Sequence, residues 1–283
     1  MAAIPAEPAD VKSCCAEAYS RDVVALVLGP SFHPGGLALT RHLADALNVR
    51  PGQRVLDIAS GPGTTALLLA AEYGVRVVGV DYSANLTAKA SDSGHDAGLT
   101  GRVGFLVGDA EQLPFPDASF DAVVCECAFC TFPVKTAAAA EFARVLRPGG
   151  RLGITDVTVR PDALPPQLRD LTGVIACLAG ARPLQDYVRL LADAGLGTIR
   201  AEDQRQALTD MVDRIEARLR VLALTRPSPT GTFCSAVYQP RPGGELAREA
   251  VIRAYPAAPS RIAAAAIPVS ATARSMSIPV RET

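Results

Sequence analysis

A glycine-rich turn between two short apolar segments constrains the fold of this chain more than any other feature. Residues 54–58 (RVLDI) and 76–81 (RVVGVD) have the composition of strands, and an apolar helical segment over 64–73 lies between them. The turn Gly61-Pro62-Gly63 joins the first strand to this helix. Two strands separated by one helix need a crossover connection, which favours a parallel pair. The sequence therefore predicts a parallel α/β sheet.

The alternation of strand and helix continues to residue 157. Further helices are predicted over 83–97 and 137–146, and further strands over 103–107, 122–125 and 151–157. These strands are continuous runs of Val, Ile and Leu, which is typical of strands covered on both faces. We therefore predict an α/β fold whose doubly wound, mostly parallel sheet occupies residues 51–160.

Helical segments are predicted on both sides of this sheet. One helix over 11–28, capped by Asp10, and another over 37–47 form a predicted N-terminal helical cap over residues 1–50. An α-rich extension that binds the acceptor is predicted over 161–255.

Within that extension, the periodicity predicts four elements. They are helices over 164–178, 183–194 and 208–224 and a short strand over 198–201. Beyond Leu224 only residues 232–239 are a strand candidate. Residues 256–283 are rich in Ala, Pro, Ser and Arg without periodicity, so we predict disorder there.

Composition excludes several classes of protein. With 28 Lys and Arg against 29 Asp and Glu, the net charge of −1 argues against a nucleic-acid partner. No apolar run reaches the roughly 18 residues of a membrane helix, and the first ten residues lack the features of a secretory signal. We therefore expect a cytoplasmic protein without a membrane partner, whose seven cysteines are reduced thiols.

Carboxylates close three of the predicted strands. Asp57 and Asp81 end the first two, and Asp109 follows the third. Parallel strands end at one edge of a sheet, where ligands bind. The glycine turn suits either a dinucleotide pyrophosphate or the aminoacyl end of S-adenosylmethionine. Asp57 favours the second cofactor, because a carboxylate repels a diphosphate and attracts an ammonium group.

As a set, these motifs resemble the class I S-adenosylmethionine-dependent methyltransferases over about residues 51–157. The resemblance implies that Asp57 and the glycine turn hold the methionine end of the cofactor, Asp81 the ribose and Asp109 the adenine. The full set of implied cofactor-binding residues is Tyr19, Asp57, Ala59, Gly61, Gly63, Asp81, Tyr82, Asp109, Ala110 and Glu126.

The cysteines suggest a methyl acceptor. The run 176–181 (ACLAGA) resembles the Cys-Leu-Gly-Gly-Ala run of arsenite methyltransferases, and the Cys14-Cys15 pair resembles the paired cysteines near the start of that family. The resemblance implies methyl transfer to trivalent arsenic, with Cys14, Cys15 and Cys177 as catalytic residues and a thiol reductant as cosubstrate. The candidate arsenic ligands are Cys14, Cys15, Cys127, Cys130, Cys177 and Cys234. Thiolates select soft arsenic over hard ions.

Two other functions remain open from the sequence. The enzyme could methylate oxygen, nitrogen or carbon of a small organic molecule, with cysteines that only pack as small hydrophobes. Alternatively, the chain could bind a metalloid without catalysis. A zinc site is disfavoured, because Cys127-x-x-Cys130 has no second pair. We predict Cys125 to be a core residue and His33 to be part of a turn. The sequence does not predict an oligomeric state.

Overall fold

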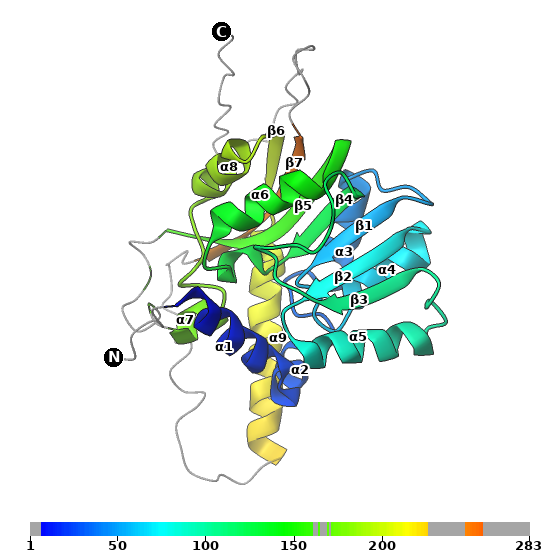
Figure 1. The fold of residues 1–283 in the computed structure, drawn as a ribbon. Coiled ribbons are helices and arrows are strands. Elements are labelled where there is room, and N and C mark those ends of the chain that lie inside the picture. Colours follow the sequence, from blue (N-terminus) through cyan, green and yellow to red (C-terminus); the bar gives the residue numbers. More distant parts are fainter. Residues whose placement is uncertain (1–6, 161–163, 165–168, 170, 226–246, 257–283) are drawn as a thin grey trace.

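The structure is a computed structural model that describes residues 7–160, 164, 169, 171–225 and 247–256. Its seven-stranded sheet has the order β3-β2-β1-β4-β5-β7-β6 (Figure 1). The strands are β1 (Arg54–Ile58), β2 (Arg76–Asp81), β3 (Val103–Val107), β4 (Phe120–Glu126), β5 (Leu146–Val159), β6 (Leu196–Asp203) and β7 (Ala247–Pro256). Strands β1 to β5 pair in parallel, and β7 is antiparallel to β5 and β6. The predicted doubly wound, mostly parallel fold is confirmed.

Helices cover both faces of the sheet. They are α1 (Pro8–Ser20), α2 (Asp22–Leu28), α3 (Gly36–Ala46), α4 (Thr64–Tyr73), α5 (Ala84–Asp96), the 3-10 helix η1 (Phe129–Thr131), α6 (Lys135–Val145), α7 (Leu171–Ile175), α8 (Leu184–Asp193) and α9 (Arg205–Thr225). Helices α3 and α4 share a core with one face of the sheet, and α6 and α8 share a core with the other.

Successive side chains of β1 point to opposite faces of the sheet and therefore belong to different cores. Val55 belongs to the core under α3 and α4, while Leu56 and Ile58 belong to the core under α6 and α8. Both faces of β1 are buried, which explains its continuous apolar sequence. Strand β1 is central, so the ends of its neighbours β2 and β4 flank Asp57.

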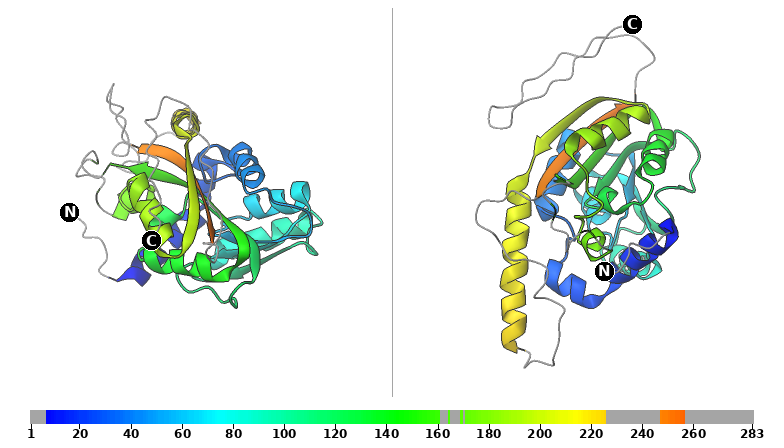
Figure 2. Two further views of the ribbon diagram at one scale, coloured as in Figure 1. Left: turned by 90° about the horizontal axis from the view of Figure 1, so that it is seen from above. Right: turned by 90° about the vertical axis from the view of Figure 1, so that its left-hand side faces the viewer.

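The single helix predicted over 11–28 is wrong. Arg21 has an extended backbone (φ −73°, ψ 134°) that separates α1 from α2. After this break α2 packs against α9, where the Arg218 guanidinium donates to the carbonyl of Val27 at 2.8 Å. Figure 2 shows α9 extending past the sheet with α2 beside it. This tertiary contact outweighs the continuous helical pattern of the sequence.

The C-terminal part also differs from the prediction. The described part of the segment 164–178 contains only the short helix α7, because Cys177 has a left-handed backbone (φ 61°) that a continuing helix does not allow. The extension contributes β6 and β7 to the sheet, and β7 was not predicted. Residues 232–239, Cys234 and residues 257–283 lie outside the described residues. Among the residues that the structure describes, no helix has the length and apolarity needed to cross a membrane.

Candidate functional site

The carboxyl ends of the parallel strands and helix α1 enclose a pocket. Asp57, Asp81 and Glu126 line it from the ends or near-ends of β1, β2 and β4, because these strands run in parallel and in register. Lys12 and Tyr19 line it from α1. The ten predicted cofactor-binding residues line this pocket with one exception, Gly63, which shapes its turn.

The glycine turn after β1 has a tightly constrained backbone. Gly61 and Gly63 have φ of 53° and 84°, and Ala59 has φ of 55° although it has a side chain. A Cβ at Gly63 would lie 2.8 Å from the Phe105 ring and 2.9 Å from Ala90. Glycine is therefore required at 63 by conformation and by space. The turn delivers the N-terminus of α4 to the pocket, where the helix dipole is positive.

Asp57 is buried in the pocket without a counterion. Its carboxylate is 2% exposed, and its Oδ2 has no hydrogen-bond partner among the described residues. Burial, reinforced by the negative charges of Glu126 and Asp81, raises the pKa of Asp57 well above its ordinary value. A ligand that brings positive charge would relieve this arrangement. The ammonium group of S-adenosylmethionine fits that need.

Asp81 is held rigidly at the end of β2. The backbone N–H of Gly61 donates to its Oδ2 and that of Ser83 to its Oδ1, both at 2.8 Å. Each oxygen keeps a further lone pair that can accept a hydroxyl. Asp81 thus suits the paired hydroxyls of a ribose. Tyr82, which is 40% exposed, lies beside it at the pocket edge.

Glu126 ends β4 in a polar cluster. Its Oε2 accepts from the hydroxyls of Thr65 at 2.6 Å and Thr40 at 3.0 Å, and lies 3.5 Å from His33 Nε2. Its Oε1 has no partner within the described part of the chain. His33, which we predicted to be a turn residue, is buried and lines the pocket. Thr40 and Thr65 could not be predicted from the sequence, because hydroxyls within helices have no characteristic spacing.

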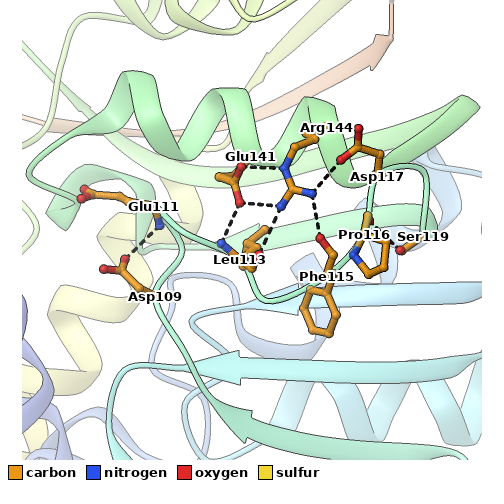
Figure 3. A network of polar contacts seen from close by, with 9 residues as sticks. All are labelled: Asp109, Glu111, Leu113, Phe115, Pro116, Asp117, Ser119, Glu141 and Arg144. Carbon is orange, nitrogen blue, oxygen red and sulfur yellow. Dashed lines mark hydrogen bonds and ion pairs between the residues drawn. The ribbon is translucent and has the colours of Figure 1, made fainter.

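Asp109 and Ala110 lie on the loop that follows β3. Asp109 Oδ1 accepts from the backbone N–H of Glu111 at 2.9 Å, and its Oδ2 pairs with Lys12 Nζ at 2.6 Å. Figure 3 shows that Arg144 and Glu141 of α6 form hydrogen bonds and ion pairs with the following part of this loop, residues 113–117. Arg144 donates to the carbonyl of Phe115 at 2.7 Å. The position of Asp109 is therefore fixed by the protein itself.

Two thiols from distant segments meet beside this pocket. Cys127 follows β4 and lines the pocket, and Cys177 follows α7. Their Sγ atoms are 3.8 Å apart. Both residues have positive φ, 50° for Cys127 and 61° for Cys177, which is uncommon outside glycine. Backbone outliers of this kind cluster at functional sites.

Two further groups complete the contacts of Cys177. The Tyr19 hydroxyl lies 3.4 Å from Cys177 Sγ and donates to the carbonyl of Ile175 at 2.7 Å. Hydrogen bonds from the Cys127 and Cys130 thiols lower the pKa of Cys177 well below its ordinary value. The half-buried ammonium of Lys135 adds to this effect. These contacts favour the thiolate form of Cys177.

The other cysteines differ in their placement. Cys15 lines the pocket, and burial together with the negative charge of Cys177 raises its pKa to about 12. Burial likewise raises the pKa of Cys130 well above its ordinary value. Cys14 is not among the residues that line the pocket. Cys125 is fully buried in the core, as predicted.

The thiol site does not have the arrangement of a metal-ion site. Within the described ranges, no group of three or more His, Cys, Asp or Glu residues could hold a metal ion. Cys127 and Cys177 can therefore offer two close sulfur atoms to a thiophilic substrate rather than a resident metal centre. Asp156 of β5, which was not predicted, contacts the segment that carries these thiols. It is fully buried and accepts from the backbone N–H of Cys130 at 2.7 Å.

Comparisons with known proteins show which family the chain resembles. The family model described as a methyltransferase domain matches residues 56–154. The 27-O-demethylrifamycin SV methyltransferase of Amycolatopsis mediterranei is 36% identical over 196 residues, which cover 66% of this chain and 70% of that protein. The arsenite methyltransferase of Halobacterium salinarum is 35% identical over 156 residues, which cover 53% of this chain and 38% of that protein.

The fold is also similar to solved structures. The phosphoethanolamine N-methyltransferase 2 of Haemonchus contortus, in complex with S-adenosyl-L-methionine, gives a TM-score of 0.67 at 19% identity. This comparison covers 87% of this chain and 60% of that chain. At such identity the likeness supports the fold alone.

Proposed function

Because this chain belongs to the family of S-adenosylmethionine-dependent methyltransferases, we propose that it methylates trivalent arsenic held by cysteine thiolates. The substrate is arsenite or methylarsenite. The observation that supports this proposal is the approach of Cys127 Sγ to Cys177 Sγ at 3.8 Å beside the cofactor pocket. The similarity to an arsenite methyltransferase over 156 residues is consistent with it.

Capture of arsenic is an exchange of ligands. Each thiol forms a sulfur–arsenic bond as an arsenic–oxygen bond breaks, and the thiol proton leaves with the hydroxyl group as water. Cys177, whose pKa is lowered by hydrogen bonds from the Cys127 and Cys130 thiols, is suited to react first. Soft thiolate ligands select arsenic over hard ions. The arsenic lone pair is retained, and no proton leaves arsenic, so a general base is not required.

The residues of the cofactor pocket position the second reactant. Asp57 pairs with the ammonium group, and Asp81 and Asp109 hold the ribose and the adenine. When bound, S-adenosylmethionine would supply a methyl group on a cationic sulfur. The arsenic lone pair would form the new bond to the methyl carbon, and the electron pair of the sulfur–methyl bond would return to the sulfur to give S-adenosylhomocysteine. Catalysis is then mainly positioning, with the reacting atoms about 3–3.5 Å apart. A thiol reductant serves as cosubstrate.

A second candidate function is methyl transfer to oxygen, nitrogen or carbon of a small organic molecule. The similarity to a rifamycin SV methyltransferase favours it, as does the burial of His33 beside Glu126 in the pocket. However, His33 Nδ1 lies 3.1 Å from the carbonyl of Pro34 and Nε2 faces Thr40 and Glu126. Both ring nitrogens thus have protein partners, which weakens the case for His33 as a base.

The test is to incubate the protein with S-adenosylmethionine, arsenite and a thiol reductant and to separate the arsenic species. We expect methylated arsenic from the unaltered protein and none from Cys177→Ser. Cys125→Ser is the matched control, because this thiol is equally buried but packs in the core. Cofactor binding is measured in parallel by calorimetry with S-adenosylhomocysteine. Cofactor binding without methylated arsenic would overturn the arsenic proposal and favour an organic acceptor.

A further inference from the structure

Helix α1 has a doubly paired lysine at its cofactor end. Lys12 Nζ lies 2.6 Å from Asp109 Oδ2 and 2.5 Å from Glu111 Oε2. The Lys12 side chain is 14% exposed and that of Glu111 is 7% exposed, so both ions are shielded from water. Shielded ion pairs resist screening by salt better than surface pairs do. This contact is therefore suited to hold α1 in place.

The partners of Lys12 belong to a rigid frame. Glu111 Oε1 accepts from the backbone N–H of Val134 at 2.6 Å, and the backbone N–H of Glu111 donates to Asp109. Downstream, Leu113 is bonded through its N–H to Glu141 and through its carbonyl to Arg144 (Figure 3). Lys12 thus joins α1 to a loop that α6 already fixes.

The C-terminal end of α1 contacts the thiol site from the same face of the helix as Lys12. Tyr19 is two turns beyond Lys12, about 10 Å along the helix, and Cys15 lies between them on the pocket side. The Tyr19 hydroxyl contacts Cys177 Sγ at 3.4 Å and the carbonyl of Ile175 at 2.7 Å. One rigid helix therefore contacts the implied adenine site at one end and the acceptor thiol at the other.

Other anchors of α1 are few. Its N-cap residue Glu7 makes no side-chain capping bond, and Val11 is its one buried residue. A short helix with so little buried surface depends on tertiary contacts to stay ordered. The Lys12 pairs and the Tyr19 contacts supply them.

We infer that Lys12 is a positioning residue that couples cofactor binding to the acceptor thiol through α1. The inference rests on the proposed function, because it takes the pocket as the cofactor site and Cys177 as an acceptor thiol. A cofactor amino group that donates to Asp109 would share the carboxylate that Lys12 holds. Binding of the cofactor therefore stabilises the position of α1 in the structure, in which the Tyr19 hydroxyl contacts Cys177.

The test measures how S-adenosylhomocysteine changes the rate of Cys177 alkylation by iodoacetamide, followed by peptide mass spectrometry. For the unaltered protein we expect saturating S-adenosylhomocysteine to slow alkylation by about tenfold, within the usual range of coupling between two sites. In Lys12→Met the protection falls to less than about threefold, because α1 loses both ion pairs. Glu111→Gln gives a similar loss, and Lys12→Arg restores part of the protection.

Arg21→Met is the matched control, because Arg21 ends α1 in an exposed pair with Glu17. It should leave the protection unchanged. The double variant Lys12→Met, Glu111→Gln should lose no more than Lys12→Met alone if the two residues act as a pair. Unchanged protection in Lys12→Met, with S-adenosylhomocysteine still bound, would overturn this inference alone. Failure of the unaltered protein to bind S-adenosylhomocysteine would overturn both it and the proposed function.

Discussion

The cofactor side and the thiol side of the pocket are built in different ways. Asp57 and Asp81 close regular parallel strands, so strand register alone brings them to one edge. Cys127 and Cys177 lie just beyond regular elements, at backbone positions with positive φ. The sheet therefore supplies the proposed cofactor site, while irregular segments supply the proposed acceptor site. This division explains how one fold can serve many acceptors.

The two sides also differ in charge. Asp57 lies near two other carboxylates, Glu126 and Asp81. Among the described residues, neither Asp57 nor Asp81 forms a salt bridge with a cationic side chain. On the thiol side, the half-buried ammonium of Lys135 donates to the carbonyls of Cys130 and Phe132, and its charge lowers the pKa of Cys177. The first side favours a cationic ligand and the second favours an anionic thiolate. In the protein without cofactor, a variant that alters the charge on one side should leave the charge on the other side intact.

The largest expected effect comes from Asp57→Asn. Removal of one partner of a buried ion pair costs about 3 kcal/mol, so the Kd for S-adenosylhomocysteine should rise by about 100-fold. Calorimetry measures this change, and Asp92→Asn on the exposed side of α5 is the control. Binding of phenylarsine oxide, a two-thiol reagent, should not change. Phenylarsine oxide binding is measured without cofactor, and its loss together with S-adenosylhomocysteine binding would show that the two sides are not built separately.

A smaller effect is expected from Gly79→Ala, which disturbs the support of the glycine turn. A Cβ at Gly79 would lie 2.4 Å from the Phe105 ring and 2.7 Å from Ser60 Oγ. Overpacking of this kind lowers the free energy of unfolding by about 1–3 kcal/mol. Gly104→Ala on the neighbouring strand is the control, since nothing lies within 4 Å of a Cβ there. Urea unfolding compares the two, and equal stabilities would refute the packing argument.

On the thiol side, Lys135→Met should slow the alkylation of Cys177. The pKa of Cys177 is lowered by hydrogen bonds from the Cys127 and Cys130 thiols and, to a smaller extent, by the Lys135 charge. Loss of that charge raises the pKa, and one unit of pKa corresponds to about tenfold less thiolate when the pH is below it. The rate of alkylation against pH measures the shift. Lys89→Met, which removes an exposed pair with Asp22, should have no effect. Faster alkylation in Lys135→Met would show that the Lys135 charge does not lower the pKa of Cys177.

The same division decides what the sequence could predict. The strand pattern predicted the sheet and the edge at which Asp57 and Asp81 lie, because period and register follow from the residues themselves. It did not predict the left-handed backbones of Cys127 and Cys177, since both positions have side chains that disfavour them. Motif resemblance nominated Cys177, and its place after the fourth predicted strand nominated Cys127, but the separation of the two thiols is set by tertiary packing.

Three charged residues escaped prediction for separate reasons. Lys12 and Lys135 lie at helix positions where a lysine usually faces solvent. Asp156 had a usable signal, because a carboxylate within the apolar strand predicted over 151–157 is rarely buried without a purpose. β7 was missed because its pairing with β5 and β6 joins segments far apart in sequence. The partners of such a strand cannot be identified from its own sequence pattern.

The smallest expected effect is a fall in stability between pH 6 and pH 8 in the protein without cofactor. Burial raises the pKa of Asp156 to about 7, against about 3.9 for an unfolded aspartate. The folded state therefore binds more protons than the unfolded state between these values, so the free energy of unfolding decreases as the pH rises. From pH 6 to pH 8 the loss due to Asp156 is about 1–2 kcal/mol. Asp57, whose pKa burial also raises, adds to the loss from the cofactor side.

Urea unfolding of the unaltered protein and Asp57→Asn at the two pH values separates the contributions of the two sides. In Asp57→Asn the dependence on pH should be smaller but still present, because Asp156 remains on the thiol side. The comparison with Asp57→Asn removes the opposite contribution of Cys177, whose lowered pKa stabilises the folded state as the pH rises. An equal dependence on pH in the two proteins would show that Asp57 is ionised at little cost. In that case the cofactor pocket would not need a cationic ligand to balance it, and the electrostatic contrast between the two sides would be lost.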